Sequence, residues 1–225
     1  MKEAMMTMPV VIGSRSPRRL ELLQTIVERE RLTVLPPLTA DEPGFDDLSS
    51  LSEFETRILQ IVELKLRDVC AQLQSGAGPA EPCVVVCADT TVIVEGADGR
   101  LRALGQPPAG DAWPDTVRQW FREFLAGKTH LVLSGVSVAR CDGSGEVTAT
   151  LHRVSTTRVT MRSDVDQWLD WYVSTGEPVG KAGGYAVQGA GSVFVTTLEG
   201  SYSNVVGLPI ENTAKMLRAI GALSS

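Results

Sequence analysis

The hydrophobic positions of this chain fall into short β-branched runs and longer stretches with helical spacing. Residues 10–13 form the first apolar run and predict a buried strand. Apolar residues then recur with roughly helical spacing between residues 20 and 27. Pro17 suits the first turn of that helix, and Ser16 before it suits the N-cap. The start of the chain therefore predicts a strand, a tight turn and a helix.

Three later features set further expectations. Ser52 with Glu55 is a capping-box pattern, and Ser163 is the expected N-cap of a later helix. The apolar run 83–88 leads directly into Asp89, so we expect Asp89 to end a central strand. The whole pattern predicts strands over 10–13, 31–35, 83–88, 92–95, 100–104, 129–139, 146–161 and 192–198, and helices over 17–27, 52–73, 109–126, 163–174 and 209–220.

The order of these elements mixes βα units with antiparallel hairpins. It predicts a mixed α/β sheet rather than a regular parallel one. A chain of 225 residues can form one substantial domain, or a domain with two lobes that share one core. We expect residues 1–225 to form a single domain, since the chain shows no repeats and no low-complexity tail.

Charge and hydropathy narrow the functional classes. The formal net charge of −6 argues against general nucleic-acid binding, which usually leaves a basic footprint, but not against a local pocket for a small anion. No apolar stretch approaches the roughly 20 residues of a membrane span. The first residues, MKEAMMTMPVVIG, are a poor match to a signal peptide. The expected location is the cytoplasm, without membrane partners.

The cysteines and histidines exclude some chemistry. The four cysteines form no C-x-x-C pair, and Cys87 and Cys141 have no activating neighbour, which favours small packed residues over a thiol nucleophile. Only two histidines are present, which disfavours a histidine-rich zinc site. A hard metal ion bound by carboxylates is the better hypothesis.

The segment GSRSPRRLELL, residues 13–23, is the first candidate site. The start of a helix presents unpaired N–H groups and a partial positive charge. The hydroxyls of Ser14 and Ser16 and the guanidiniums of Arg18 and Arg19 would add to a phosphate site there. The alternative is an ordinary capped helix with two solvated arginines. The spacing alone leaves both interpretations open.

Two carboxylates could serve such a site. At the end of a central strand, Asp89 could hold Mg²⁺ or act as a general base, or it could simply cap a turn at Thr91. Glu42 lies in an acidic loop where most residues are solvated, but with Asp89 it could bind the metal ion of a phosphate. Lys65 by itself looks like a surface lysine.

A glycine-rich segment holds the last candidates. Glycines permit close approach of the backbone to a ligand, and they also simply form turns. Lys181, Tyr185 and Gln188 lie in this segment. The amide of Gln188 offers one donor group and one acceptor and could contact a base edge.

Together these stretches resemble the Maf family of nucleotide pyrophosphatases. The matching segments occur in family order and cover nearly the whole chain: SRSPRR with ELL (14–23), Asp41-Glu42, Lys65, ADT (88–90), LGQP (104–107), GKTH (127–130), GEP (176–178), KAGGYAVQG (181–189) and SYSNVVGLP (201–209). One S-x-S-P-R-R motif could arise by chance, but an ordered set of this length is far more specific.

The resemblance implies a two-lobed mixed α/β fold similar to inosine triphosphate pyrophosphatases, with the active site in the cleft between the lobes. It implies hydrolysis of a nucleoside triphosphate to the monophosphate and pyrophosphate, with Mg²⁺ or Mn²⁺. It also implies the following roles: Asp89 as general base, Glu42 and Asp89 as metal ligands, Ser14, Arg18, Arg19 and Lys65 at the triphosphate, and Arg18, Thr90 and Gln188 at the positions that tune base choice. Ser16 and Lys181 are further candidates for substrate binding.

The Y-x-x-Q-G form of residues 185–189 is similar to the family branch that acts on dTTP and UTP. Two positions depart from the family pattern. Gln106 replaces a lysine near the phosphates, for which Arg100 or Arg102 could substitute, and Gly180 replaces an aspartate of unassigned role. Losing one such cation could cost about 2–4 kcal/mol of transition-state stabilisation.

Two functions follow from the resemblance. The first is a house-cleaning pyrophosphatase that removes unusual or excess pyrimidine triphosphates, with Asp89 as base. The alternative is a nucleotide-binding regulatory protein linked to cell division, with weak or no catalysis, which the change at Gln106 keeps open. The family also tends to form dimers, so a homodimer is a further expectation.

Overall fold

A computed structural model of the chain describes residues 8–39 and 42–224. Its strands are β1 (Val10–Ile12), β2 (Leu32–Val34), β3 (Cys83–Glu95), β4 (Leu101–Leu104), β5 (Thr129–Cys141), β6 (Val147–Met161) and β7 (Val195–Glu199). Within the described residues these form one sheet in the order β2-β1-β3-β5-β6-β7, and β4 pairs with β3 off this path. β1 is parallel to β2 and β3, and the other pairs are antiparallel. The predicted mixed α/β sheet is confirmed.

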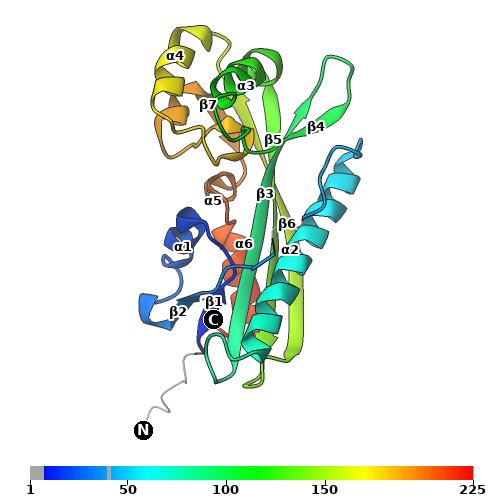
Figure 1. The fold of residues 1–225 in the computed structure, drawn as a ribbon, viewed down its shortest axis with the longest axis vertical. Coiled ribbons are helices and arrows are strands. Elements are labelled where there is room, and N and C mark those ends of the chain that lie inside the picture. The colour runs from blue at the N-terminus through cyan, green and yellow to red at the C-terminus, as the bar shows by residue number, and fades with distance from the viewer. Residues whose placement is uncertain (1–7, 40–41, 225) are drawn as a thin grey trace.

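The helices are α1 (Pro17–Leu23), α2 (Leu51–Gln74), α3 (Trp113–Trp120), α4 (Asp166–Ser174), α5 (Tyr202–Val206) and α6 (Ile210–Ala219). Shorter turns are η1 (Arg29–Arg31), the π-helical η2 (Phe121–Leu125), η3 (Ala182–Gly184) and η4 (Ala190–Phe194). The long strands β3, β5 and β6 run through the molecule with α2 alongside them (Figure 1). α1, β1 and β2 lie toward one end, and α3, α4 and β7 lie at the other (Figure 1).

The capping box of α2 lies two residues before the predicted one. Ser50, not Ser52, is the N-cap, and Glu53 completes the box. The Glu53 carboxylate accepts the backbone N–H of Ser49 at 2.9 Å and that of Ser50 at 2.8 Å. Two overlapping Ser-x-x-Glu-like patterns occur here, and the first is used because its glutamate reaches both free amides.

Other boundaries also differ from the predictions. Ser163 is not an N-cap, since α4 begins at Asp166 after Val165 without a side-chain cap. The helix predicted from residue 109 begins at Trp113, which places Pro114 in its first turn, where proline is tolerated. Residues 192–194 belong to η4 rather than to a strand. The five residues of α5 are too few to give a periodic pattern, and the sequence reading missed this helix.

The prediction that Asp89 ends its strand is wrong. Asp89 lies in the middle of β3. The strand continues because Asp89, Thr90 and the β-branched residues after them pair with β5, with Thr90 opposite Ser134. On the other edge of β3, the pairing with β1 extends only as far as Val86, and the pairing with β4 begins at Val92. Asp89 and Thr90 therefore lie opposite a gap between two short edge strands.

Alternate residues of β3 pack on opposite faces of the sheet. On one face, α2 covers the strand along its length through Cys83, Val85, Cys87 and Ile93. On the other face are two separate cores: a first core with α1 and α6, which includes Val84, Val86 and Ala88, and a second core with α3 and α4, which includes Val92 and Val94. Thr90 lies between these two cores along the strand.

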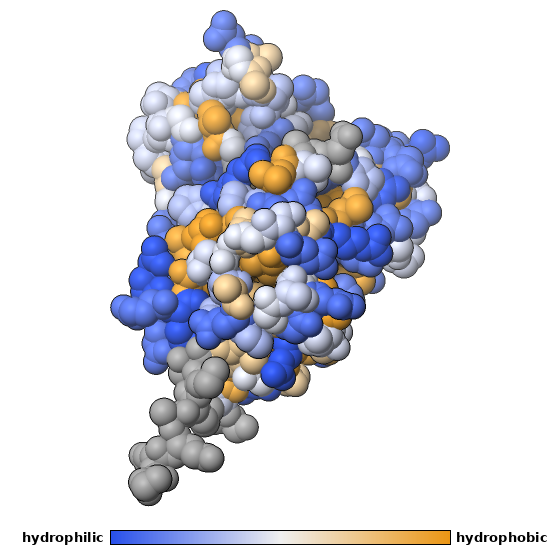
Figure 2. Space-filling model, turned by 60° about the horizontal axis from the view of Figure 1, so that its bottom comes forward, coloured by the Kyte–Doolittle hydropathy of each residue, from blue (hydrophilic) through white to orange (hydrophobic). Residues whose placement is uncertain are grey.

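All four cysteines are buried in the described structure, as expected for packed residues. Among residues 8–39 and 42–224, no helix is both long and apolar enough to cross a membrane. Figure 2 shows a face on which hydrophobic residues form patches among hydrophilic ones.

Candidate active site

A cavity of about 870 Å³ opens over Asp89 and Thr90, at the gap between β1 and β4. Two walls face each other across it. We call the first the charged wall; its side chains are Ser14, Arg18, Arg19, Glu42, Lys65 and Asp89. We call the second the glycine-rich wall; it consists of residues 179–182 and 185–188.

The cavity brings together every described residue that the sequence singled out. Its lining includes Ser14, Ser16, Arg18, Arg19, Glu42, Lys65, Asp89, Thr90, Lys181 and Gln188. These residues come from α1, α2, β3 and loops that are far apart in the chain. Asp41, which belonged to the same motif as Glu42, lies outside the described residues. The alternative of solvated arginines is not what the structure shows, because Arg18 and Arg19 both line the cavity.

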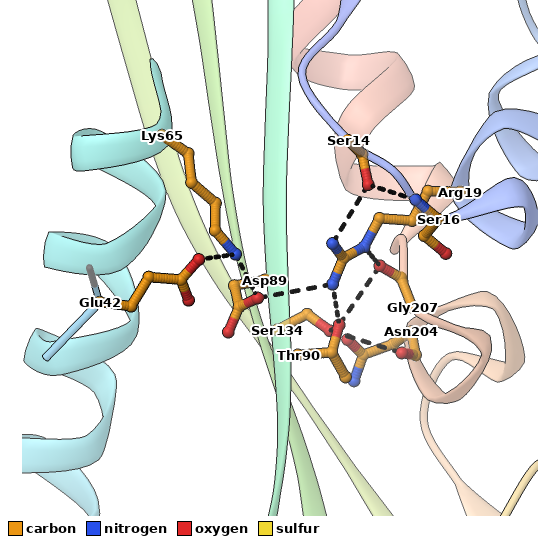
Figure 3. Close-up of polar contacts among 10 residues, drawn as sticks. All are labelled: Ser14, Ser16, Arg19, Glu42, Lys65, Asp89, Thr90, Ser134, Asn204 and Gly207. Atoms are coloured by element: carbon orange, nitrogen blue, oxygen red, sulfur yellow. Dashed lines mark hydrogen bonds and ion pairs between the residues drawn. The ribbon is translucent and has the colours of Figure 1, made fainter. Parts of the chain in front are cut away.

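An ion cluster occupies the charged wall (Figure 3). The ammonium of Lys65 lies 2.6 Å from Asp89 Oδ1 and 3.1 Å from Glu42 Oε1. The Lys65 side chain comes from α2 and is only 12% exposed, so it is not the surface lysine that it resembles in isolation. Two carboxylates and one ammonium thus share a site in which Lys65 and Asp89 are largely shielded from solvent and Glu42 is exposed.

Arg19 reaches Asp89 from the opposite side of β3, as Figure 3 shows. Its Nη2 lies 3.8 Å from Asp89 Oδ1, and its Nε donates to the carbonyl of Gly207 at 2.9 Å. Its Nη1 and Nη2 donate to the hydroxyls of Ser14 and Thr90, both at 3.4 Å. The guanidinium is therefore held in place by groups from three parts of the chain.

Ser16 takes the N-cap position of α1, but its side chain makes no capping hydrogen bond. Its backbone N–H instead donates to the Ser14 hydroxyl at 3.1 Å. Ser14 is 6% exposed and accepts from Arg19 as well. The serine pair therefore joins the turn after β1 to Arg19 rather than capping the helix.

Arg18 and Lys181 face the cavity from opposite walls. Burial, followed by the charge of Arg19, lowers the pKa of Arg18. Burial, followed by the charge of Arg18, lowers the pKa of Lys181. Both cations are thus partly desolvated and repelled by a like charge, a condition that a bound polyanion would relieve.

The backbone that adjoins the glycine-rich wall is held by hydrogen bonds to Glu177 and Gly105. The Glu177 carboxylate accepts the backbone N–H groups of Ala190 at 2.7 Å and Gly191 at 2.8 Å. The N–H of Gly183 donates to the Gly105 carbonyl at 3.0 Å. Gly183 has a φ of +70°, and a Cβ there would meet Val92 Cγ2 at 2.8 Å, so this position requires glycine.

Gln188 and Gln106 are exposed residues that line the cavity. The suggestion that another arginine substitutes near Gln106 is not supported by the structure. Arg102 donates to Asp98 at 2.7 and 2.9 Å, within the β3–β4 hairpin. Neither Arg102 nor Arg100 is among the residues that line the cavity.

The profile of the Maf-like protein family matches residues 9–220. The chain belongs to this family. The resemblance identified from the motifs is therefore confirmed, and several of those motifs contribute residues to the cavity of this Maf-like protein.

Curated relatives cover nearly the whole length of this Maf-like chain. A dTTP/UTP pyrophosphatase of Methylobacillus flagellatus is 38% identical over 94% of this chain and 92% of the relative. A dTTP/UTP pyrophosphatase of an Anaeromyxobacter species is 36% identical over 96% of this chain and 91% of the relative. Both names agree with the branch that the Y-x-x-Q-G segment indicates.

One solved structure with some similarity is a nucleoside-triphosphatase, or dITP/XTP pyrophosphatase, from Mycobacterium abscessus. The match has a TM-score of 0.33 and 15% identity over 69% of this chain and 74% of that one. A likeness this weak supports no conclusion about the fold or the activity.

The fit of the charged wall to a divalent metal is limited. Among residues 8–39 and 42–224, no group of three or more His, Cys, Asp or Glu side chains could hold a metal ion. Glu42 and Asp89 nevertheless converge on one point, where Lys65 contacts both. Mg²⁺ is commonly bound by one or two carboxylates together with substrate phosphates. The residues therefore fit a metal ion that a triphosphate helps to hold, and not a closed protein site.

Sequence reasoning gave no role to Gly207, which lines the cavity, or to Ser134 and Glu177, which do not. Ser134 is fully buried in β5 and bonds to Thr90, and Gly207 supplies the carbonyl that accepts from Arg19. Glu177 and Gly207 lie in motifs that had been recognised without any assigned role. Ser134 gave no sequence signal, because a serine within an apolar strand is not distinctive.

Proposed function

We propose that this Maf-like protein hydrolyses dTTP, UTP or related unusual nucleotides to the monophosphate and pyrophosphate. The names of its relatives and the chemistry of the cavity support this activity. The observation that carries the proposal is the position of Asp89, whose carboxylate lies in the cavity between Lys65 at 2.6 Å and Arg19 at 3.8 Å. A base and two cations in one shielded pocket suit phosphoanhydride hydrolysis.

In the proposed reaction, water attacks the α-phosphorus and the bond to the bridging oxygen of the β-phosphate breaks. Asp89 takes the proton from the water as it attacks. Arg18, Arg19, Lys65 and Lys181 stabilise the charge that develops on the phosphate oxygens and on the leaving pyrophosphate. No covalent intermediate on the protein is needed.

Glu42 and Asp89 are the residues that would hold a divalent cation, Mg²⁺ or Mn²⁺, together with the triphosphate. When bound, such an ion would neutralise phosphate charge as a Lewis acid. Gln188 would contact the edge of the base, since its amide can both donate and accept a hydrogen bond.

The test is pyrophosphate release from dTTP, UTP, ITP and 7-methyl-GTP with Mg²⁺. We expect release mainly from dTTP and UTP, and a loss of about 10²–10⁴-fold in kcat for Asp89→Asn, which removes the base. Asp98→Asn, on the hairpin beyond the cavity, is the matched control and should keep full activity.

Measurable nucleotide binding without release above the Asp89→Asn background would overturn the enzyme proposal. It would favour the regulatory nucleotide-binding protein instead. Release mainly from ITP would move the substrate class to purines.

We further propose that the whole chain, residues 1–225, acts as one domain with two lobes beside the cavity, that it works in the cytoplasm as a homodimer, and that it does not bind nucleic acid. Size-exclusion chromatography with light scattering tests the dimer. Titration with duplex DNA at low salt tests whether the protein binds nucleic acid.

A further inference from the structure

A chain of hydroxyl groups runs from the buried Ser134 through Thr90, which lines the cavity, to Arg19. The Ser134 and Thr90 hydroxyls lie 2.8 Å apart, facing each other across the β5–β3 pair. Thr90 Oγ1 accepts from Arg19 Nη2 at 3.4 Å and donates to the Gly207 carbonyl at 3.3 Å. Ser134 also lies 3.4 Å from the Asn204 carbonyl, to which it can donate.

One arrangement of protons satisfies all the neighbours of the Thr90 hydroxyl. This hydroxyl has one proton to donate and two lone pairs to accept with, and it has three neighbours: Ser134, Gly207 and Arg19. If Ser134 donates to Thr90, Thr90 donates to Gly207 and accepts from Arg19, and every group is satisfied. The hydroxyl is thus directed at the guanidinium and at the carbonyl that holds it.

Ser134 has 0% exposure and cannot touch a nucleotide in the cavity. Gly207 closes α5 with a φ of +131°, a conformation that favours glycine, and its carbonyl accepts from Arg19 Nε at 2.9 Å. The orientation of Arg19 thus depends on β5, β3 and α5 together.

We propose that Ser134 and Thr90 are positioning residues that orient the Arg19 guanidinium toward the reacting phosphates. Ser134 acts through Thr90, whose hydroxyl accepts from Arg19. This inference rests on the proposed function for its kinetic test. A preorganised guanidinium avoids the cost of reorienting as charge develops in the transition state.

The chain offers matched controls for both positions. Thr91 is the next residue on β3, 3% exposed, and it lies on the opposite face of the sheet from Thr90. Ser137 lies on β5, fully buried, and bonds to His152 at 2.8 Å without lining the cavity. Each control loses a hydroxyl from the same strand, but without a link to Arg19.

In the kinetic experiment, Thr90→Val should lower kcat with dTTP about 30-fold and Ser134→Ala about fivefold, with KM changed less than twofold. Thr91→Val and Ser137→Ala should stay within twofold of the wild type. Thr90→Ser, which restores the hydroxyl, should recover most of the activity. Equal losses in Thr90→Val and Thr91→Val, or no recovery in Thr90→Ser, would overturn the proposal.

A second measurement does not need activity. Hydrogen exchange at the Arg19 Nε–H can be followed by NMR in the full-length protein, with the signal assigned by its loss in Arg19→Lys. We expect exchange at least fivefold faster in Thr90→Val and Ser134→Ala than in the two controls. Unchanged exchange would refute the positioning role. Changed exchange in a protein that releases no pyrophosphate would refute the proposed function and leave this inference standing.

Discussion

The two walls of the cavity hold their functional groups in different ways. On the charged wall, the side chains themselves are fixed: Lys65 by two carboxylates, and Arg19 by Gly207, Ser14 and Thr90. On the glycine-rich wall the backbone is fixed instead, while Gln188 remains an exposed side chain. The difference suggests that the chemistry needs preorganised charge, whereas base recognition needs a firm support with side chains left free to meet a ligand.

Removing the charge of Arg19 is the strongest challenge to this comparison. We expect Arg19→Met to lower kcat/KM with dTTP about 10²–10³-fold, because a preorganised cation is lost. The free energy of unfolding should fall by less than about 2 kcal/mol, as for a few lost hydrogen bonds. Urea denaturation beside the activity assay checks both, with Arg67→Met on the exposed face of α2 as control. Comparable losses of activity and folding would mean that Arg19 is structural.

A buried histidine that contacts the glycine-rich wall leads us to expect that the stability of the protein depends on pH. His130 is 2% exposed and its Nε2 lies 2.7 Å from the Tyr185 hydroxyl. Burial lowers the pKa of His130 from 6.5 to about 4. As the pH falls, the unfolded chain takes up this proton first. The contribution of His130 is therefore complete above pH 6.5 and is lost between about pH 6.5 and pH 4.

We expect this group to remove about 3 kcal/mol from the free energy of unfolding by pH 4. Urea titrations at pH 7, 5.5 and 4 should show a steeper decline for the wild type than for His130→Gln. His152→Gln, at an exposed histidine, should decline like the wild type. If the free energy of unfolding declines equally with pH in the wild type and in His130→Gln, the buried histidine does not cause the pH dependence.

Glu177 tests whether the backbone of the glycine-rich wall matters for binding. Glu177→Gln weakens the two charge-assisted bonds to Ala190 and Gly191 without emptying the position. We expect KM for dTTP to rise about tenfold with kcat nearly unchanged, and amide exchange to increase over residues 180–191. Glu199→Gln, at an exposed ion pair with Arg158, is the control. A fall in kcat alone would place Glu177 with the catalytic charges instead.

The smallest effect is expected at Gln106, where the family usually has lysine. Gln106→Lys adds a cation to the cavity and should raise kcat/KM about fivefold, since a partly exposed charge contributes about 1 kcal/mol. Gln60→Lys, on the exposed side of α2, should change nothing. Unchanged activity in Gln106→Lys would show that the existing cations already saturate the phosphates.

The sequence by itself determined the mixed α/β class, most of the elements and the residue types of the site. These are local or ordered signals: periodic apolar runs, and motifs that keep their order along the chain. It also predicted that Arg18 and Arg19 face a shared cleft, and both line the cavity.

Tertiary structure alone decided how those residues are held. Asp89 lies within β3 rather than at its end because pairing with β5 continues past it, a contact that no local pattern records. Arg19 is fixed by Gly207, 188 residues further along the chain, and Thr90 by Ser134 on a neighbouring strand. Such contacts depend on the register of the sheet and the packing of α5, so they exist only once the chain has folded.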